Sequence, residues 1–248
     1  MQRNFADYVR DYTSLNFEDI QEKYRFKRLL ELLSEMQTAH HSRNILEVGP
    51  GNNSVSKSFT DFDEYTILEP IEYFYSTLNG IDTKVQVRKE TLEEYIESDT
   101  AIIFNLVILS SVVHELEDPV STLIGLKKII GVGSKVIVVV PNNLSLHRIL
   151  GEREGHAKAG PTLTETERRM QQYTSFSVES LKGFAGICGY LVTEVFTSFV
   201  KPLPHFKMHK LVNEEVISEF DLDFLYSISK IMEPYGSEIF AVLEKSSD

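Results

Sequence analysis

Two acidic residues and a glycine turn stand where short apolar runs end in the first third of the chain. Glu47 lies in the apolar run 45–48 and precedes Gly49 and Gly51, and Glu69 follows the next such run. A carboxylate after a second strand can accept hydrogen bonds from both hydroxyls of a ribose. Glycine turns often bind phosphate, but Glu47 would repel a pyrophosphate and attract the α-ammonium of a methionine moiety. These residues favour S-adenosyl-L-methionine, which carries an ammonium and a ribose but no phosphate.

These residues need a parallel sheet to bring them to one edge, and the hydrophobic pattern predicts such a sheet. Continuous apolar runs alternate with helical patterns, which is typical of strands that helices cover on both faces. The carboxyl ends of parallel strands share an edge, where α/β proteins bind their ligands. We expect strands at 45–48, 65–68, 85–87, 101–109, 136–140, 191–200 and 238–243.

Helices are expected between the strands, and some of them carry start and stop signals. Asp118 can cap a helix that has Pro119 at its first position and Gly131 at its end. Ser177 can cap a helix whose apolar residues recur at helical spacing. Further helices are expected over 17–36, with Asn16 as its cap, and through Ile217, Phe220, Phe224, Ile228 and Ile231.

One stretch interrupts this alternation. Residues 142–175 are rich in Gly, Thr and charged residues, and they form a connection longer than is usual in a compact α/β domain. Such a connection is typical of a lid or a substrate-binding insertion. We therefore expect a single domain over 1–248, with residues 1–40 as an N-terminal helical cap and residues 142–175 as a substrate lid.

The order of these pieces resembles the class I S-adenosylmethionine-dependent methyltransferases over nearly the whole chain. The first motif of that family, an acid followed by G-x-G-x-G, is similar to Glu47-Val48-Gly49-Pro50-Gly51-Asn52-Asn53. Asn53 replaces the third glycine, and asparagine is the next best residue at positive φ. The resemblance implies a Rossmann-like, doubly wound, mostly parallel seven-stranded sheet. Its C-terminal antiparallel hairpin would be formed by 191–200 and 238–243.

The resemblance also implies roles for other segments. Lys89-Glu90-Thr91-Leu92 lies where such enzymes commonly cover the adenine, and Ser110 to Pro119 looks like the segment that faces cofactor and substrate. Many relatives have Glu-His there, whereas this chain has His114-Glu115. The segments 141–148, 199–203 and 235–240 look similar to a bacterial subgroup, many of whose members act in carbohydrate or natural-product pathways.

Together these arguments give a set of expected contacts for S-adenosyl-L-methionine and for its product, S-adenosyl-L-homocysteine (SAH). The expected cofactor-binding residues are Tyr24, Arg25, Glu47, Gly49, Pro50, Gly51, Asn53, Glu69, Pro70, Glu90, Thr91, Leu92, Ser110 and Ser111. The expected substrate-binding residues are Glu115, Arg148 and Tyr173.

Two histidines are candidates for a catalytic base. A hydroxyl acceptor must lose its proton at or before methyl transfer, and the near-neutral pKa of histidine suits that task. His114 and then His147 are the candidates, because they follow the fourth and fifth strands. A neutral amine acceptor needs no strong base. We predict transfer to a hydroxyl of a small molecule, such as a sugar or natural-product intermediate, with N-methylation of a small amine as the alternative.

Two rival functions belong to other classes. An NAD(P)-dependent Rossmann oxidoreductase would share the glycine turn and Glu69, but its motif is G-x-G-x-x-G, and Ser54 occupies the last position here. A non-catalytic binding module could keep the fold without the chemistry. Methyl transfer to any acceptor would exclude this second rival.

The composition restricts partners and compartment. The net charge of −12, without a basic patch, argues against nucleic acid and anionic membranes and leaves a small-molecule substrate. A homodimer is left open. The single cysteine, Cys188, fits a reducing compartment, so we expect the protein to be cytoplasmic. We expect no metal, because the adjacent His40 and His41 point in different directions and no third ligand is evident.

Overall fold

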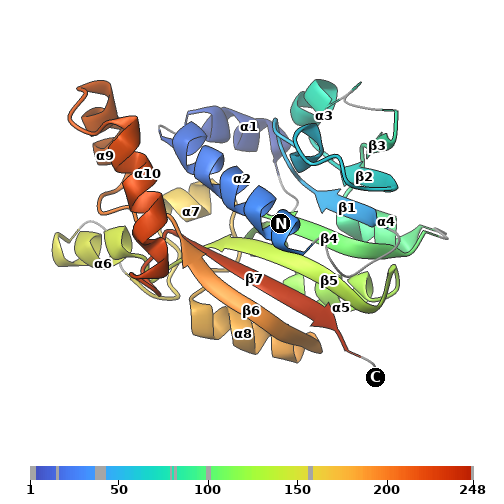
Figure 1. Ribbon diagram of the computed structural model, residues 1–248. Helices are drawn as coiled ribbons and strands as arrows, with labels where there is room; N and C mark the ends of the chain where they lie inside the picture. The colour runs from blue at the N-terminus through green and yellow to red at the C-terminus, as the bar shows by residue number, and fades with distance from the viewer. Residues whose placement is uncertain are drawn as a thin grey trace.

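A seven-stranded sheet forms the centre of the molecule (Figure 1), in the order β3-β2-β1-β4-β5-β7-β6. The computed structural model describes residues 4–14, 17–36, 43–78, 80, 83–98, 102–155 and 159–246. The strands are β1 (Asn44–Val48), β2 (Glu64–Leu68), β3 (Val85–Arg88), β4 (Phe104–Ser110), β5 (Ile130–Pro141), β6 (Tyr190–Ser198) and β7 (Glu238–Lys245). The first five are parallel to one another, whereas β7 is antiparallel to both β5 and β6. The predicted fold class is confirmed.

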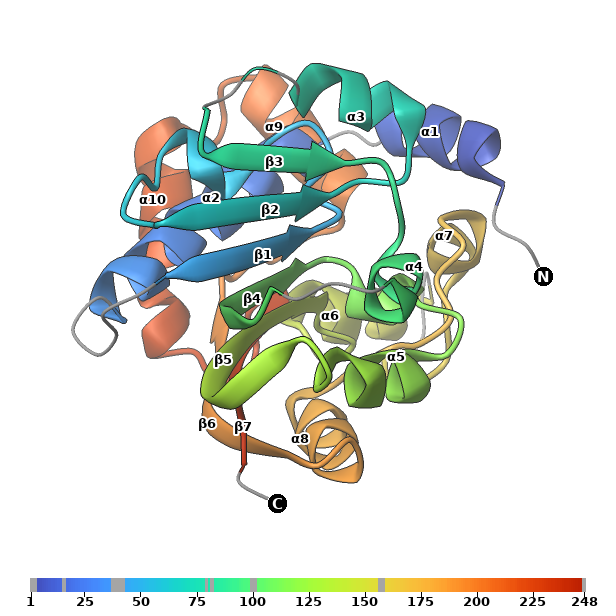
Figure 2. The ribbon, with the colours of Figure 1, turned by 90° about the vertical axis from the view of Figure 1, so that its right-hand side faces the viewer.

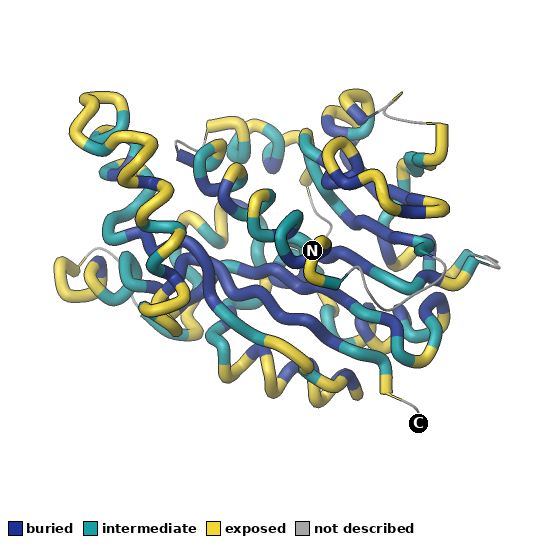
Figure 3. Tube along the Cα trace, in the orientation of Figure 1, coloured by how far each residue is buried: buried dark blue, intermediate teal, exposed yellow. Residues whose placement is uncertain are grey.

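Helices cover both faces of the sheet (Figure 2). The α-helices are α1 (Phe5–Thr13), α2 (Glu18–Glu35), α3 (Glu72–Leu78), α4 (Leu92–Glu97), α5 (Pro119–Leu126), α6 (Leu146–Arg153), α7 (Glu165–Arg169), α8 (Val178–Ile187), α9 (His205–Asn213) and α10 (Glu219–Ser227). Apolar residues of α4, α5 and α8 pack on one face, and those of α2 and α3 pack on the other. Figure 3 shows the strands as the buried layer between these helices. Burial on both sides explains why the strand sequences are continuously apolar.

The predicted strand 136–140 is longer in the structure, and this corrects the expected end of the preceding helix. Helix α5 ends at Leu126, and Gly131 lies inside β5 instead of ending the helix. Strand β5 begins at Ile130, which pairs with Phe104 of β4 before the register shifts. Pairing between β5 and β4 therefore places Gly131 in a strand, although the capping pattern alone predicts it at the end of a helix.

The N-cap residue of α2 and the exposure of the apolar residues of α10 also differ from the predictions. Phe17, at φ +74°, is the N-cap of α2, and Asn16 lies outside the described residues. The spacing that predicts a helix through 217–231 is confirmed in α10, but it does not mark a buried face. Phe220 is 80% exposed and Ile231 is 85% exposed. Ser177 caps α8 as expected, through a capping box with Ser180.

Two segments lie over the carboxyl edge of the sheet. Helix α1, which the sequence pattern does not reveal, begins at Asn4, whose backbone N–H donates to the Gln171 side chain at 2.9 Å. The stretch 142–175 contains α6 and α7, and Arg148 of α6 forms an ion pair with Glu167 of α7 at 2.8 Å. Residues 156–158 of this stretch and residues 37–40 of the predicted N-terminal cap lie outside the described residues.

Candidate active site

A cavity of about 880 Å³ lies at the carboxyl edge of the sheet. Residues at the ends of β1, β2, β4 and β5 form its floor, and side chains of α1, α2 and the stretch 142–175 line its walls. Its volume falls within the range typical of ligand sites. Of the predicted site residues, those that line it are Arg25, Glu47, Gly49, Pro50, Gly51, Asn53, Glu69, Pro70, Thr91, Leu92, Ser110, Ser111, His114, Glu115, His147, Arg148 and Tyr173.

Two ends of this cavity differ in composition, and we name each by its most characteristic residue. The glycine end comprises Gly49, Gly51, Glu69, Thr91 and Ser111. The lysine end comprises Gln21, Arg25, His147, Lys201, His205 and Ser237.

The glycine turn after β1 holds two glycines in the left-handed conformation, which glycine adopts without strain. Gly49 has φ +60° and Gly51 has φ +64°, where other residues are strained. A Cβ atom at Gly49 would lie 3.0 Å from Cγ2 of Val112, and a Cβ at Gly51 would extend into open space. Asn53 is not at positive φ, so the reason given for its replacing a glycine is wrong. The turn therefore lets backbone approach a ligand at two positions.

The Glu47 carboxylate is buried and held by protein donors. Oε1 accepts from the Val55 backbone N–H at 3.1 Å, and Oε2 accepts from the Tyr65 hydroxyl at 2.9 Å and from the Ser54 hydroxyl. Burial raises the pKa of Glu47, and these hydrogen bonds oppose the change. The carboxylate thus ties the glycine turn to β1 and β2, in addition to facing the cavity.

The Glu69 carboxylate is fixed at the floor of the glycine end. Oε2 accepts from the Gly51 backbone N–H at 3.1 Å, and Oε1 accepts from the Ile71 backbone N–H at 3.0 Å. The side chain is 2% exposed. Two backbone donors therefore hold this acceptor in place before any ligand arrives.

The glycine turn does not lead into an α-helix. Residues Val55–Lys57 form a single turn of 3-10 helix, and β2 follows. Phosphate sites in dinucleotide-binding folds use the N-terminus of a helix at this place, where several N–H groups and the helix dipole attract the anion. Here the turn is followed by a single 3-10 turn instead of an α-helix, and the Glu47 carboxylate lies beside it. The site therefore lacks the features that bind a phosphate group.

His114 connects the end of β4 with the stretch 142–175. It lies in the short 3-10 helix Val113–Glu115, is 3% exposed, and its carbonyl accepts from the backbone N–H groups of Tyr173 and Thr174 at 2.9 and 3.2 Å. Ser111, just before it, has φ +62°. A non-glycine residue in this region stores strain of about 1–3 kcal/mol, which is common at functional sites.

His147 lies at the lysine end, and its surroundings do not suit a base. Its Nδ1 lies 3.0 Å from the Ser145 hydroxyl. Burial, together with the nearby Lys201, His205 and Arg148, holds the pKa of His147 well below its usual range. A base with such a low proton affinity drives proton abstraction poorly, so His147 is poorly suited to the role of base.

Two predicted cofactor-binding residues do not line the cavity. The Tyr24 ring is completely buried and stacks on Phe199 at 4.7 Å, and its hydroxyl donates to Asp223 at 3.2 Å. The hydrophobic pattern of α2 predicts that one face of the helix is buried, but it does not show whether Tyr24 packs in the core or lines the cavity. Glu90 forms an ion pair with Arg88, and the adjacent Glu93 lines the cavity in its place.

Several residues that line the cavity were missed. Tyr8 and Tyr12 of α1 line it, and Tyr8 donates to Glu115 at 3.0 Å. Their spacing with Phe5 on a short helix was the available signal. At the lysine end, Gln21, Lys201, His205 and Ser237 come from four separate segments. The single cation inside the apolar run 199–203 was the only hint of this cluster.

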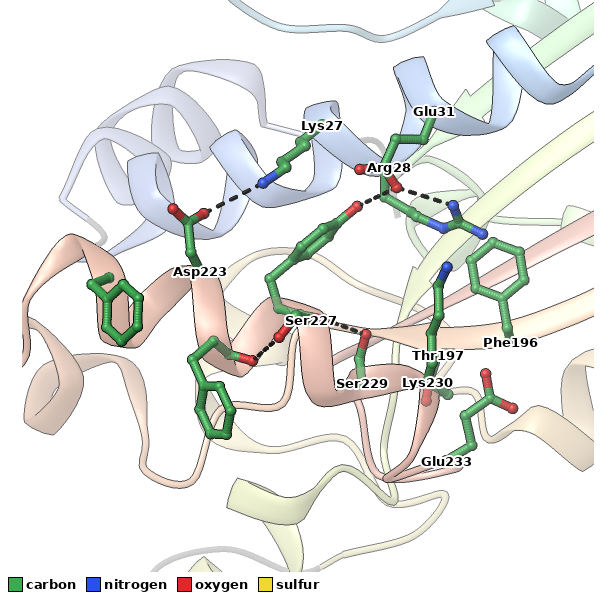
Figure 4. Close-up of a pocket in the computed structure, with 13 residues that line it drawn as sticks. Lys27, Arg28, Glu31, Phe196, Thr197, Asp223, Ser227, Ser229, Lys230 and Glu233 are labelled. Atoms are coloured by element: carbon green, nitrogen blue, oxygen red, sulfur yellow. Dashed lines mark hydrogen bonds and ion pairs between the residues drawn. The ribbon is translucent and has the colours of Figure 1, made fainter.

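A second hollow lies between α2 and α10, beside the edge strand β6, and Figure 4 shows its lining. We call it the α2–α10 groove. Four of its charged groups pair with one another: Lys27 with Asp223 at 3.4 Å, and Arg28 with Glu31 at 3.1 Å, where Glu31 also accepts from the Tyr226 hydroxyl at 2.7 Å. It lacks the residues of the glycine turn. The cavity at the carboxyl edge is therefore the candidate active site.

The described residues contain no candidate metal site and no candidate membrane-spanning helix. Within the described residues, no group of three or more His, Cys, Asp or Glu side chains could hold a metal ion. His40 and His41 fall outside those residues. No helix in the described part of the chain has the length and apolar character needed to cross a bilayer.

Comparisons with known proteins support the fold. No family model matches the sequence, and no curated protein matches it. The solved plantazolicin methyltransferase BpumL, in complex with a pentazolic desmethylPZN analog and SAH, has 16% identity and a TM-score of 0.57, covering 92% of this chain and 85% of its own.

Two further solved structures are similar over most of their length. A possible histamine N-methyltransferase from Thermotoga maritima has 19% identity and a TM-score of 0.54, covering 90% of this chain and 91% of its own. A SAM-dependent methyltransferase from Archaeoglobus fulgidus has 16% identity and a TM-score of 0.55, covering 91% and 98%. The chain therefore has the fold of these methyltransferases.

Proposed function

We propose that this protein is an S-adenosyl-L-methionine-dependent methyltransferase that binds its cofactor at the glycine end of the cavity. The observation that carries the proposal is the fixed Glu69 carboxylate, which two backbone N–H groups hold beside the glycine turn. A ribose offers two neighbouring hydroxyls to such an acceptor. Gly51 leaves space next to it, since a Cβ there would meet nothing within 4 Å.

The rival dinucleotide is less compatible with this site. A pyrophosphate would face the buried Glu47 carboxylate and would find only the 3-10 turn Val55–Lys57 in place of a helix N-terminus. Like charges a few ångströms apart repel strongly where water is scarce. S-adenosyl-L-methionine instead presents an ammonium group, which the negative potential of Glu47 favours, and several of the similar structures contain SAH.

The acceptor in this proposal is a small molecule. Helix α1 and the stretch 142–175 meet over the cavity through Asn4 and Gln171, and they leave a volume of about 880 Å³ for cofactor and acceptor together. We infer that this stretch acts as a substrate lid, with the Arg148–Glu167 ion pair joining its two helices. The charge of −12 supports exclusion of nucleic acid, and the single cysteine supports a cytoplasmic location.

We further propose a hydroxyl acceptor, on a sugar or natural-product intermediate, with His114 as its base. The cofactor supplies a sulfonium methyl group that is open to in-line attack, so the chain contributes mainly by positioning. His114 is buried at the end of β4 and bonded through its carbonyl to the lid, where it can take the hydroxyl proton. His114→Ala should then lower kcat by about 10²–10⁴-fold and leave SAH affinity nearly unchanged. A kcat close to wild type would remove His114 as the base.

A small amine is the second candidate acceptor, and the charge of the cavity favours it. Glu22, Glu115, Glu117 and Glu165 all line the walls, and a negative potential attracts ammonium groups. Because the neutral amine already has a lone pair, this reaction would need no histidine base.

One experiment tests the function and separates the acceptors. The protein is incubated with ¹³C-methyl-labelled S-adenosyl-L-methionine and host metabolite extract, and products that gain the labelled methyl are sought by mass spectrometry. The ¹³C chemical shift of that methyl then distinguishes an O-methyl from an N-methyl product. NAD(H) binding in titration calorimetry without SAH binding would contradict the proposal. SAH binding without any labelled product would favour a non-catalytic binding module.

A further inference from the structure

The lysine end of the cavity contains a buried cation without a direct counterion. Lys201 is 1% exposed and lines the cavity. Its ammonium donates to Oε1 of Gln21 at 2.8 Å, and within the described residues no carboxylate pairs with it. An ammonium has three N–H donors. Buried charges are normally paired, because burial without a partner costs several kcal/mol.

The neighbouring carboxylates are committed to another cation. Arg25 binds Glu238 through Nε at 2.5 Å and Glu18 through Nη2 at 3.1 Å. Gln21 donates to the same Glu238 oxygen at 3.3 Å, and its own oxygen accepts from Nε2 of His205 at 3.0 Å as well as from Lys201. This network holds Lys201 in position but leaves its remaining donors toward the cavity.

The backbone that presents Lys201 is strained and firmly held. Phe199 has φ +57° and stacks on Phe17, which has φ +74°, with ring centroids 6.3 Å apart. The Ser237 backbone N–H donates to the Phe199 carbonyl at 2.9 Å. Bulky residues at positive φ are outliers that persist only where the surrounding structure imposes them, and they gather at functional sites.

Ser237 adds a second donor at the same place. It is 3% exposed, lines the cavity, and its hydroxyl is buried without a hydrogen-bond partner among the described residues. Native structures rarely leave buried hydroxyls unpaired, so this group indicates a missing partner. The Lys201 ammonium, with Gln21 as its one hydrogen-bond acceptor among the described residues, and the unpartnered Ser237 hydroxyl therefore both line the same end of the cavity.

We propose that Lys201 and Ser237 form a subsite that binds a carboxylate group of the acceptor molecule. The inference rests on the proposed function, because it concerns the acceptor of that reaction. A carboxylate can accept from both donors in short, charge-assisted hydrogen bonds. Arg25 and Lys201 together balance Glu18 and Glu238, so this end of the cavity carries no large positive charge. This matches a monoanion better than a doubly charged phosphate.

The subsite should depend on pH in a defined direction. Burial lowers the pKa of Lys201 to about 7, with Arg25 acting in the same direction and Glu18 and Glu238 opposing it. The other facing groups are His147 on α6 and His205 on α9, and burial lowers the pKa of both, that of His205 to about 3. Of the cations at this end, the Lys201 ammonium is the one that titrates near pH 7. Carboxylate affinity should therefore be highest below pH 7 and fall by up to about tenfold per pH unit above it.

Propionate and its uncharged analogue propionamide are suitable probes. Titration calorimetry with SAH-loaded protein at pH 6 should show propionate binding about tenfold or more tightly than propionamide. Lys201→Met should abolish this preference, whereas Lys207→Met, which changes an α9 lysine paired with Glu154, should keep it. Because no carboxylate among the described residues forms an ion pair with Lys201, Lys201→Met leaves no direct ion-pair partner behind and is expected to fold. Ser237→Ala, which removes only the hydroxyl, provides the test if it does not.

Several results would overturn the subsite. Equal binding of propionate and propionamide to the wild type would do so, as would an unchanged preference in Lys201→Met or in Ser237→Ala. Tighter binding of inorganic phosphate than of propionate would reject the carboxylate as the ligand class. A propionate affinity that does not fall between pH 6 and pH 9 would show that the Lys201 charge is not involved. SAH binding to the wild type is measured separately, so failure of the proposed function remains distinguishable.

Discussion

At the glycine end of the cavity, backbone N–H groups and hydroxyls from nearby positions in the chain hold the Glu47 and Glu69 carboxylates, whereas at the lysine end side chains from distant segments hold one another. Glu47 and Glu69 are fixed by donors only 8 and 18 residues away in the chain. Lys201 and Gln21 are 180 residues apart, and Arg25 and Glu238 are 213 apart. One end is a local structure, and the other exists only when distant segments have assembled.

This difference has consequences for how the two ends respond to mutation. At the glycine end a substitution changes contacts to the ligand, because the backbone donors that orient the site remain. At the lysine end a substitution leaves a charged partner buried and unpaired, which costs more than the lost interaction itself. We therefore expect cofactor-affinity defects at the glycine end and stability or acceptor defects at the lysine end.

The largest effect should come from Arg25→Met, which leaves the Glu238 carboxylate, whose side chain is 1% exposed, without its cation. The free energy of unfolding should fall by about 3–5 kcal/mol in urea denaturation. Arg28→Met on the same helix is the matched control, because its partners Glu31 and Glu35 are 39% and 58% exposed. That change should cost only about 1 kcal/mol. Equal losses for the two variants would contradict the special role of the buried cluster.

The next effect concerns the glycine turn. Gly49→Val places a β-branched residue at φ +60° and its Cβ 3.0 Å from the Val112 side chain, so SAH affinity should fall by about 100-fold or more. Gly133→Val is the control, since Gly133 has φ +77° with nothing within 4 Å of a Cβ and does not line the cavity. It should carry a similar backbone strain and retain SAH binding in calorimetry. Loss of SAH binding in both variants would attribute the effect to general destabilisation.

A smaller effect is expected at Glu69. Glu69→Gln keeps the shape but removes the charge, so the ribose loses a charged acceptor and SAH affinity should fall by about tenfold. Glu64→Gln, at the exposed start of β2, should leave the affinity unchanged. If titration calorimetry gave wild-type affinity for the Glu69 variant, Glu69 would not contact the cofactor.

The smallest effect should come from Tyr24→Phe. The Tyr24 hydroxyl reaches only the half-exposed Asp223 at 3.2 Å, and the ring does not line the cavity. SAH affinity should stay within about twofold of wild type, and the thermal midpoint should change little, because hydrogen bonds with exposed partners contribute little net stability. A large loss of SAH affinity would restore Tyr24 as a cofactor contact.

The fold was largely predictable because its signals are local. Burial on both faces makes the central strands largely apolar runs, and Ser177 starts α8 by bonding within its own first turn. The prediction failed where pairing between strands competes with a local signal, as at Gly131, which joins β5 because Ile130 pairs with Phe104. The prediction that Asn53 replaces a glycine at positive φ was also wrong, because a position in a sequence motif does not by itself determine the backbone conformation.

By itself, the sequence determined the sheet, the glycine turn with its carboxylates, and the edge at which they meet, since each depends on residues near one another in the chain. The tertiary structure decided which face of α2 enters the site, so that Arg25 lines the cavity while Tyr24 packs on Phe199. It also decided that Lys201 is buried without a counterion. Such an environment comes from side chains that folding brings together from distant segments, and no spacing along the chain encodes it.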